Sequence, residues 1–351
     1  MTLFRRRFAK VTRMNGGKRS KSANQSCLSV QGRSWTSRLT LAIAGITFAA
    51  LLSCGRAAPT IAVVPRTCGT TLWEAEHTGV ARVARQFGYN VYWNAPMRED
   101  DVQGQIDMLT RALAKHPNGM IISPVEALPL RSPVHHILEE GMPIVVVGTD
   151  LGLTPGKKLA YVLSDEHAGG EMAARRLGLL LHNRGSVAIL GINKQLTSTA
   201  ERSRSLEAAL SQEFPGVHVI FRSMALPTVA QEQQTTERLL SDDTPPDAIV
   251  ALSEISTRGA YYALTEFHKT NIIPLVGFDQ NLMAPLRTGG IDSIVMQDTY
   301  HMGRAAMTLM QQELNGGATQ SFVLLEPLLV NRENMDSDAV KQMVDLGWFN
   351  K

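Results

Sequence analysis

From residue 60 onward, the chain alternates between two hydrophobic periods. Short runs rich in β-branched residues alternate with stretches in which apolar residues recur every three to four positions. In the first half, the runs predict strands at 60–64, 89–93, 119–122 and 143–147, and the stretches predict helices at 73–87, 102–113 and 134–138. This β-α-β order predicts a parallel sheet that is covered by helices on both faces.

The same pattern then begins again. It predicts strands at 186–190, 217–221, 247–251, 273–276 and 293–296, and helices at 198–213, 229–240, 256–266, 282–287 and 302–314. About ten strands are more than a doubly wound sheet of typical size holds, so the sequence predicts two α/β lobes, each with its own parallel sheet. No Gly/Ser-rich linker separates the halves, which indicates short connections within the fold.

Positive charge is concentrated at the N-terminus. Residues 1–53 contain ten Lys and Arg and no Asp or Glu, although the formal net charge of all 351 residues is only +3. The remainder therefore has 25 basic residues against 32 acidic ones, a net charge of −7. An acidic body gives no reason to expect nucleic acid as a partner.

The basic segment leads into an apolar run, 39–52, that is typical of a signal peptide and short for a membrane span. The run ends in Leu51-Leu52-Ser53-Cys54, which resembles the bacterial lipobox. We therefore predict a signal peptide at 1–53, lipid attachment at Cys54 and a linker at 54–59. A buried helix that ends in Cys is the alternative. The leader is long for a signal, so Met14 or a later codon is a possible start.

Polar side chains that follow the predicted strands are the candidates for a ligand site, because open α/β sheets bind ligands beyond the carboxyl ends of their strands. The residues we select are Thr70, Trp73, Asp150, Arg202, Glu254, Asp279 and Gln297. Their bidentate groups suit the hydroxyls of a compact polyol, and an indole suits its apolar face. As alternatives, Asp279 caps a helix near residue 281, Arg202 is a solvated charge and Trp73 is an ordinary core residue.

Signatures of catalysis and of metal binding are weak in this sequence. There is no G-x-S-x-G motif, no G-x-x-x-x-G-K loop and no G-x-G-x-x-G after the first strand. The pair His135-His136 lacks further ligands nearby in the sequence, and Cys68 has no assignable activating histidine. We predict a protein that is not an enzyme and that uses no cofactor and no metal.

From Thr60 to about Met335, the chain resembles the type I periplasmic sugar-binding proteins of ABC importers, the ribose-binding group and its relatives. The matching segments are Gly88-Tyr-Asn-Val, Glu99-Asp-Asp-Val-Gln-Gly-Gln105, Gly119-Met-Ile-Ile-Ser-Pro124, Gly141-Met-Pro-Ile-Val, Ser164-Asp165 with Gly169-Gly170, Arg202-Ser-Arg204, Pro246-Asp-Ala-Ile-Val, Gly277-Phe-Asp279, Gln297 with Gly303, and Glu333-Asn-Met-Asp336. Each match is weak alone, and their order over roughly 275 residues is specific.

The resemblance implies two lobes joined by a three-strand hinge, with crossings near 164–165, 297–298 and 326–330. It implies a first lobe of 60–164 plus 298–326 and a second of 165–297 plus 327–351. In the family, the positions of Arg202, Asp279, Gln297 and Trp73 belong to a sugar-gripping arginine, a carboxylate, a hinge glutamine and a stacking aromatic. Ser253, followed by Glu254, stands where the family often has Asn, and Gly148-Thr149-Asp150 replaces the Asp-Arg pair of the ribose binders. These departures argue against ribose itself as the ligand.

The predicted function is capture of a small polar ligand, a sugar or polyol, between the lobes and its delivery to an ABC permease. The protein would lie in the periplasm or at the cell surface and touch the membrane only through its lipid. One alternative is a sensory component that presents its ligand to a chemoreceptor or histidine kinase. A lac-type transcription regulator, which would need a helix-turn-helix at the N-terminus, and an enzyme without a known motif are further alternatives.

Overall fold

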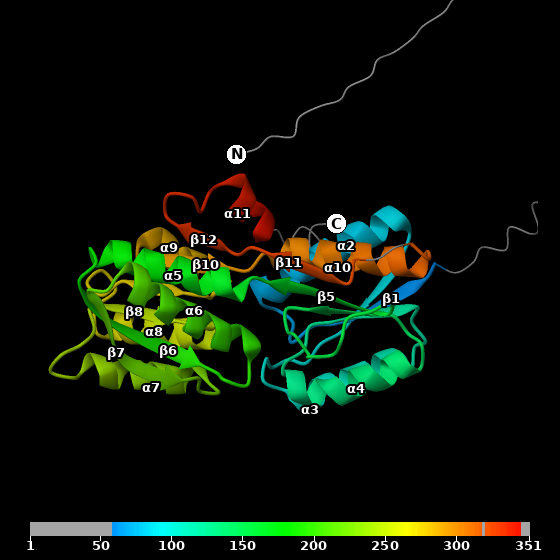
Figure 1. The fold of residues 1–351 in the computed structure, drawn as a ribbon, viewed down its shortest axis with the longest axis horizontal. Helices are drawn as coiled ribbons and strands as arrows, with labels where there is room; N and C mark the ends of the chain where they lie inside the picture. The colour runs from blue at the N-terminus through cyan, green and yellow to red at the C-terminus, as the bar shows by residue number, and fades with distance from the viewer. Residues whose placement is uncertain (1–57, 318–319, 345–351) are drawn as a thin grey trace, which may run out of the picture. The chain divides into compact units, whose positions relative to one another are not determined.

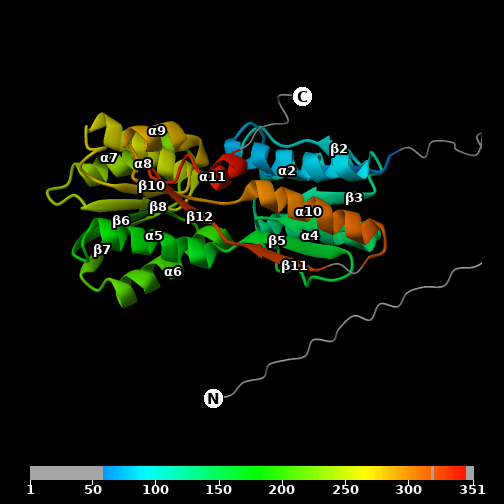
Figure 2. The ribbon, with the colours of Figure 1, turned by 90° about the horizontal axis from the view of Figure 1, so that it is seen from above.

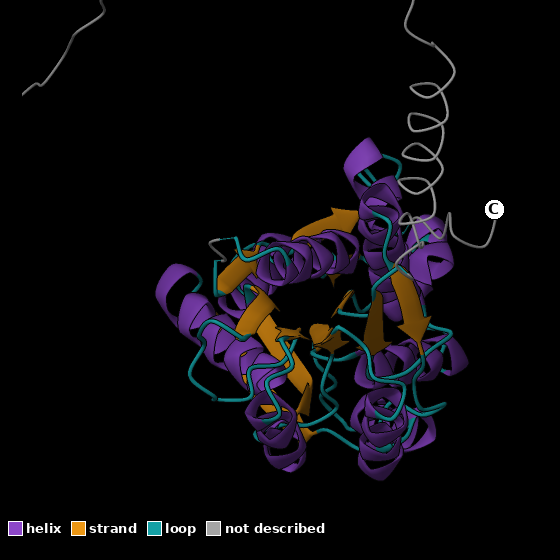
Figure 3. Cartoon of the chain, turned by 90° about the vertical axis from the view of Figure 1, so that its right-hand side faces the viewer, coloured by secondary structure: helices purple, strands orange, loops and turns teal. Residues whose placement is uncertain are grey.

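The computed structural model describes residues 58–317 and 320–344. Within these ranges, twelve strands form two sheets of six. Figure 1 shows each sheet with its own helices, and in Figure 3 the strands (orange) lie inside the surrounding helices (purple). The predicted architecture of two parallel-sheet α/β lobes is therefore confirmed. The predicted signal peptide and Cys54 lie outside the described residues.

The first sheet consists of strands from the first half of the chain plus one from its end. Its order is β11 (Phe322–Leu325), β5 (Leu159–Ser164), β4 (Ile144–Val147), β3 (Gly119–Ile122), β1 (Thr60–Val64) and β2 (Asn90–Trp93). All five pairings are parallel. The central strands are fully buried, as expected for a parallel sheet with both faces covered.

Helices cover both faces of this sheet. Helices α2 (Thr71–Phe87) and α10 (Thr299–Leu314) pack on one face, and α3 (Val102–Leu113) and α4 (Ala127–Glu139) on the other. Local signals set the bounds of α2. The Thr70 side chain accepts a hydrogen bond from the Trp73 N–H, and Gly88 ends the helix with φ of 72°, a conformation that glycine adopts without strain.

The second sheet repeats the arrangement. Its order is β12 (Leu328–Asn331), β10 (Ser293–Met296), β9 (Leu275–Gly277), β8 (Ala248–Ala251), β6 (Gly185–Ile192) and β7 (Val217–Met224). Strand β12 pairs antiparallel with β10, whereas the other pairings are parallel. An antiparallel edge strand on an otherwise parallel sheet is common in doubly wound folds.

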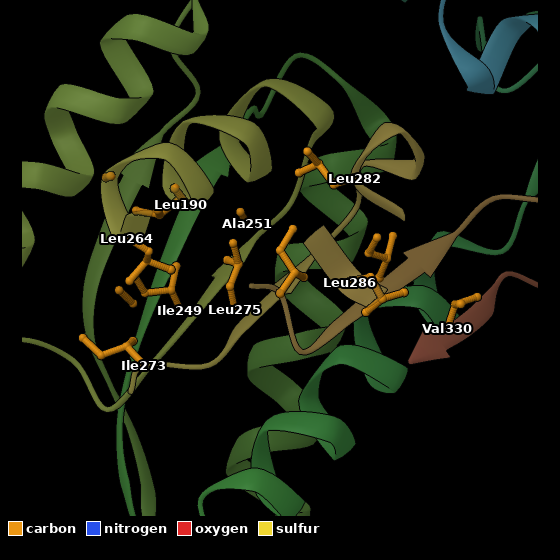
Figure 4. Packing of buried hydrophobic residues seen from close by; sticks show 14 of the residues in the cluster. Leu190, Ile249, Ala251, Leu264, Ile273, Leu275, Leu282, Leu286 and Val330 are labelled. Atoms are coloured by element: carbon orange, nitrogen blue, oxygen red, sulfur yellow. The ribbon is translucent and has the colours of Figure 1, made fainter. Parts of the chain in front are cut away.

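Two apolar clusters fill the space between this sheet and its helices. One face carries α5 (Glu166–Leu180) and α6 (Thr197–Glu213), and the other carries α7 (Val229–Leu240), α8 (Glu254–Glu266), α9 (Met283–Thr288) and α11 (Asp338–Met343). Figure 4 shows the second cluster, in which Ile249 and Leu275 from the strands meet Leu264 and Leu286 from the helices.

The chain passes between the two sheets three times. The links are β5 to α5, β10 to α10, and β11 to β12, and Figure 2 shows the last two side by side between the lobes. The three-strand hinge is thus confirmed, and the residue boundaries of the two lobes stay a prediction. Our sequence assignment omitted β5, α5, β11, β12 and α11, so the count of about ten strands was too low.

Candidate functional site

A cavity of about 350 Å³ lies between the carboxyl-end loops of the two sheets. Residues that follow β1, β3 and β4 line it from the first lobe, and residues that follow β6, β8 and β9 line it from the second. The volume is within the range of small-molecule sites. The cavity therefore lies beyond the carboxyl ends of the strands of both lobes, where open α/β sheets bind their ligands.

Four of the predicted residues line this cavity: Trp73, Arg202, Glu254 and Gln297. They come from the first turn of α2, from α6, from the start of α8 and from the link between β10 and α10. The fold brings them together from positions up to 224 residues apart in the chain. Their role in ligand binding stays a prediction, because lining a cavity is a geometric property.

Arg202 is held by a carboxylate from the hinge. Its Nε donates a 2.5 Å hydrogen bond to Glu166 Oε2, and its Nη1 donates a 2.7 Å bond to the carbonyl of Leu252. The guanidinium carbon also lies 4.3 Å from the ring centroid of Phe278. The side chains of Arg202 and Glu166 are only 7% and 12% exposed. Arg202 is therefore an oriented, buried donor and not a solvated charge on a helix.

Glu166 also binds Gln297. The Gln297 Nε2 donates to Glu166 Oε1 at 2.5 Å, so one carboxylate bridges two residues of the cavity wall. Glu166 is the first residue of α5, directly after Asp165, whose side chain caps that helix by accepting from the Ala168 N–H. The Glu166 carboxylate therefore connects the link between β5 and α5 to the link between β10 and α10, and it connects both links to α6.

The first lobe supplies an arginine and an indole that lie against each other. The Arg66 guanidinium carbon is 5.3 Å from the Trp73 ring centroid, and its Nη2 donates to Thr149 Oγ1 at 3.0 Å. The indole Nε1 donates to Glu99 Oε1 at 3.3 Å. Trp73 is buried, which agrees with its alternative as a core residue, yet it also lines the cavity.

Glu254 is a buried carboxyl group of the cavity wall. The residue is 8% exposed, and among the described residues no hydrogen-bond donor reaches its Oε1. Burial raises the pKa of Glu254 well above its usual value, and the negative charges of Glu99 and Asp279 add to this effect. A donor supplied from the cavity would satisfy this oxygen.

Three predicted residues do not line the cavity. Thr70 caps α2. Asp150 is exposed and accepts a 2.7 Å hydrogen bond from the Gly152 N–H. Asp279 is fully buried, and its Oδ2 accepts from Arg258 Nε at 3.0 Å and from Nη2 at 2.8 Å.

The capping alternative for Asp279 describes its geometry here. Its Oδ1 accepts from the Asn281 N–H at 2.9 Å, at the start of the 3₁₀ turn Gln280–Leu282. A direct ligand contact for Asp279, Thr70 or Asp150 therefore stays a prediction. The neighbour of Asp279, Phe278, faces the cavity instead.

Several lining residues were missing from the predicted site. Arg66, Asn193 and Ser253 also follow strands and line the cavity, and Glu99 and Phe278 lie inside the segments that match the family. Glu166 had no signal in the sequence, because its partners are 36 and 131 residues away.

Within 58–317 and 320–344, no helix is both long and apolar enough to cross a bilayer. In the same ranges, no group of three or more His, Cys, Asp or Glu residues is arranged to hold a metal ion.

The comparison with family models decides the family. Residues 61–318 match the periplasmic binding protein domain. The chain belongs to this family. The match runs from β1 to the segment before β11, and the two lobes have the type I periplasmic binding protein fold.

Solved structures agree with this family at the level of the fold. A solute-binding protein of an ABC transporter from Agrobacterium vitis, bound with α-D-tagatopyranose, has a TM-score of 0.75 at 20% identity and covers 81% of this chain and 98% of its own. A carbohydrate transporter protein from Agrobacterium radiobacter, in complex with D-arabinose, has a TM-score of 0.75 at 22% identity, with 83% and 100% coverage.

A third solved relative binds a cyclic polyol. It is an ABC transporter solute-binding protein from Bacillus halodurans with bound myo-inositol, and it has a TM-score of 0.71 at 20% identity. The alignment covers 82% of this periplasmic binding protein and 99% of the relative.

Proposed function

We propose that this periplasmic binding protein captures a sugar or polyol between its two lobes and delivers it to an ABC importer. The observation that carries the proposal is the interlobe cavity with Arg202 and Gln297 in its wall. The solved relatives named above are described as transporter proteins with a sugar or a cyclic polyol bound, which favours import over a sensory role.

The cavity offers the interactions that a polyol needs. Arginine, glutamine and carboxylate groups can each bond hydroxyls, and the rings of Trp73 and Phe278 can pack on apolar C–H faces. Capture would close the lobes by rotation at the crossings, because the ligand binds more tightly when both lobes contact it. The proposed activity contains no chemical step.

A thermal-shift screen against neutral sugars and polyols tests the proposal. A ligand at 100 times its Kd stabilises the folded state by about 2.7 kcal/mol, which is readily seen as a rise in Tm. Calorimetry then measures Kd for the hits. The absence of any stabilising sugar or polyol would contradict the proposal.

Replacing Arg202 by Ala should weaken binding of the hit at least tenfold. A hydrogen bond from a charged group contributes about 1.5–3 kcal/mol, and about 1.4 kcal/mol equals a factor of ten. Because the alanine leaves Glu166 without its cation, Arg202→Lys is the second variant, which keeps the charge and loses the planar fork. Arg175→Ala, an exposed residue of α5 paired with Glu213, is the control and should bind normally.

Export and anchoring complete the proposal. The supporting feature is Leu51-Leu52-Ser53-Cys54 after the basic and apolar segments. Cys54→Ala should move the protein from the membrane fraction to the soluble extracytoplasmic fraction and abolish labelling with a radioactive fatty acid. Unchanged labelling of the variant would contradict attachment at Cys54.

A further inference from the structure

One hydrogen bond joins the start of a helix in the first lobe to a side chain of the second lobe. The Thr71 N–H donates to Asn281 Oδ1 at 2.9 Å, across 210 residues of chain. Thr71 is the first residue of α2, which packs on the first sheet, and Asn281 lies in the 3₁₀ turn that follows β9 of the second sheet. Neither residue belongs to the three crossings, so the connectivity of the chain does not impose this contact.

The contact supplies an acceptor that helix α2 lacks by itself. The first N–H groups of a helix have no acceptor within that helix, and the Thr70 side chain accepts from the Trp73 N–H. The same end of α2 is fixed in the first lobe, because the Thr299 hydroxyl of α10 donates to the Leu72 carbonyl at 2.7 Å. Asn281 therefore completes the cap of α2 only while the second lobe stays this close.

A buried ion pair of the second lobe orients the Asn281 amide. Asp279 Oδ1 accepts from the Asn281 N–H at 2.9 Å and from its Nδ2 at 3.0 Å, while Asp279 Oδ2 accepts from Arg258. A carboxylate can only accept from the amide nitrogen, and a backbone N–H can only donate to the amide oxygen. Asp279 therefore holds the amide with its oxygen toward the start of α2.

We propose that Asn281 is a positioning residue for ligand capture: its side chain caps α2 of the first lobe and stabilises the arrangement in which both lobes line the cavity. The inference rests on the proposed function, because it assumes that a sugar or polyol is held between the lobes. Among the described residues, Thr71 and Asn281 lie outside the lining of the cavity, whereas Leu72, which follows Thr71, belongs to it. The bond therefore acts on affinity through the fraction of protein whose lobes are arranged for binding.

Two substitutions remove this bond from opposite sides. Asn281→Ala removes the acceptor. Thr71→Pro removes the donor and suits the site, because proline is favoured at the first position of a helix and the preceding Thr70 is already extended, with φ of −106° and ψ of 151°. Thr71→Ala, which loses the side chain but keeps the backbone N–H, is the reference for Thr71→Pro. Asn271→Ala, which removes an exposed asparagine elsewhere in the second lobe, is the control and should bind normally.

Calorimetry would measure Kd for two chemically different sugars or polyols that the thermal-shift screen identifies. Asn281→Ala and Thr71→Pro should each raise Kd about two- to tenfold, the range expected for one hydrogen bond between neutral groups, and by the same factor for both compounds. The double variant should bind no more weakly than the single variants, because both remove the same bond. Stopped-flow fluorescence of Trp73, which lines the cavity, should assign the change to faster release.

The outcomes separate this inference from the proposed function. Wild-type affinity in Asn281→Ala, an exposed site whose folding circular dichroism would check, overturns the role of the bond and leaves sugar capture intact, even if Thr71→Pro does not fold. A factor that differs between the two compounds indicates direct ligand contact, and effects that add in the double variant indicate separate structural defects, so either result also overturns the inference. If no sugar or polyol binds the wild type, the proposed function fails and this inference fails with it.

Discussion

Glu76, a fully buried glutamate of α2, makes the stability of this protein depend on pH. Its side chain is fully buried, and the Ser123 hydroxyl, at the end of β3, lies 3.0 Å from one carboxyl oxygen and 2.9 Å from the other. Burial raises the pKa of Glu76 from 4.5 to about 8, although the Ser123 hydrogen bond and the charge of Arg66 partly oppose the shift. The folded protein therefore keeps a proton on Glu76 at neutral pH.

The sign of the effect follows from proton linkage. Between pH 4.5 and about 8, the unfolded chain releases this proton and the folded chain retains it, so the free energy of unfolding falls as the pH rises. The contribution is fully present below pH 4.5 and is lost by about pH 8. One pH unit corresponds to about 1.4 kcal/mol, so the loss between pH 4.5 and 7 is about 3 kcal/mol.

Replacing Glu76 by Gln should remove this dependence. The amide keeps the shape of the side chain and an oxygen that accepts from Ser123, but it does not ionise. We expect the variant to be more stable than the wild type at pH 8 by a few kcal/mol and to differ less at pH 5. Urea unfolding followed by circular dichroism at pH 5, 6, 7 and 8 measures both curves.

A surface variant is the control, and the effect of a second buried glutamate cancels. Glu266→Gln removes an exposed charge from α8 and should leave the pH profile parallel to that of the wild type. Burial also raises the pKa of Glu232, but this contribution is common to both proteins and cancels in their difference. Parallel profiles for Glu76→Gln and the wild type would refute the argument, because they would mean that Glu76 is ionised in the folded state.

Two further predictions concern packing. Gly79→Ala should lower the free energy of unfolding by about 1–3 kcal/mol or more, because a Cβ would lie only 2.1 Å from the Tyr300 carbonyl oxygen of α10. The control Gly156→Ala should be nearly neutral, because nothing lies within 4 Å of its Cβ position. Equal urea midpoints for the two variants would contradict the close contact between α2 and α10. Ile249→Ala should lower the free energy of unfolding by about 2–5 kcal/mol, because Ile249 is fully buried in the cluster of Figure 4. Ile272 is 71% exposed and should tolerate replacement by Ala. Similar losses of stability at both sites would count against the assigned core.

Hydrophobic period was enough to predict the parts of the fold whose strands are buried on both faces. Strands such as β3 and β8 appear as short apolar runs, and the amphipathic helices beside them show a clear period. Helix α5 was missed because small residues replace large apolar ones on its buried face. The Gly170 backbone approaches α6 so closely that a Cβ would lie 2.0 Å from Ser205 Oγ, and such a contact depends on the partner helix.

Strands at the edges were harder to predict for a related reason. The segment Phe322–Asn331 is one apolar stretch interrupted by Glu326 and Pro327, yet its two halves join different sheets. Proline cannot donate to a sheet ladder, so it marks the change of sheet. The sequence alone does not show which sheet each half joins, since this is decided by pairing with β5 and β10, more than 30 residues away.

For the site, the sequence could predict which loops surround the cavity but not how each side chain on them is oriented. The rule that ligands bind beyond strand ends selected loops that do surround the cavity, and Arg202, Glu254, Trp73 and Gln297 face it. Asp279 follows β9 in the same way, but Arg258 pairs with it in the interior. Such a pair depends on a contact 21 residues away in the chain, which neither period nor residue type reveals.

The crossings connect the cavity to the hinge through very few residues. Asp165 alone separates β5 from α5, Gln297 and Asp298 separate β10 from α10, and Glu326 and Pro327 separate β11 from β12. Asp165 and Asp298 each cap the helix that follows them, so the proposed rotation of one lobe against the other would have to be absorbed within these few positions. Because Gln297 lies in one crossing and Glu166 directly follows another, the residues that orient Arg202 in the cavity share their backbone with the hinge.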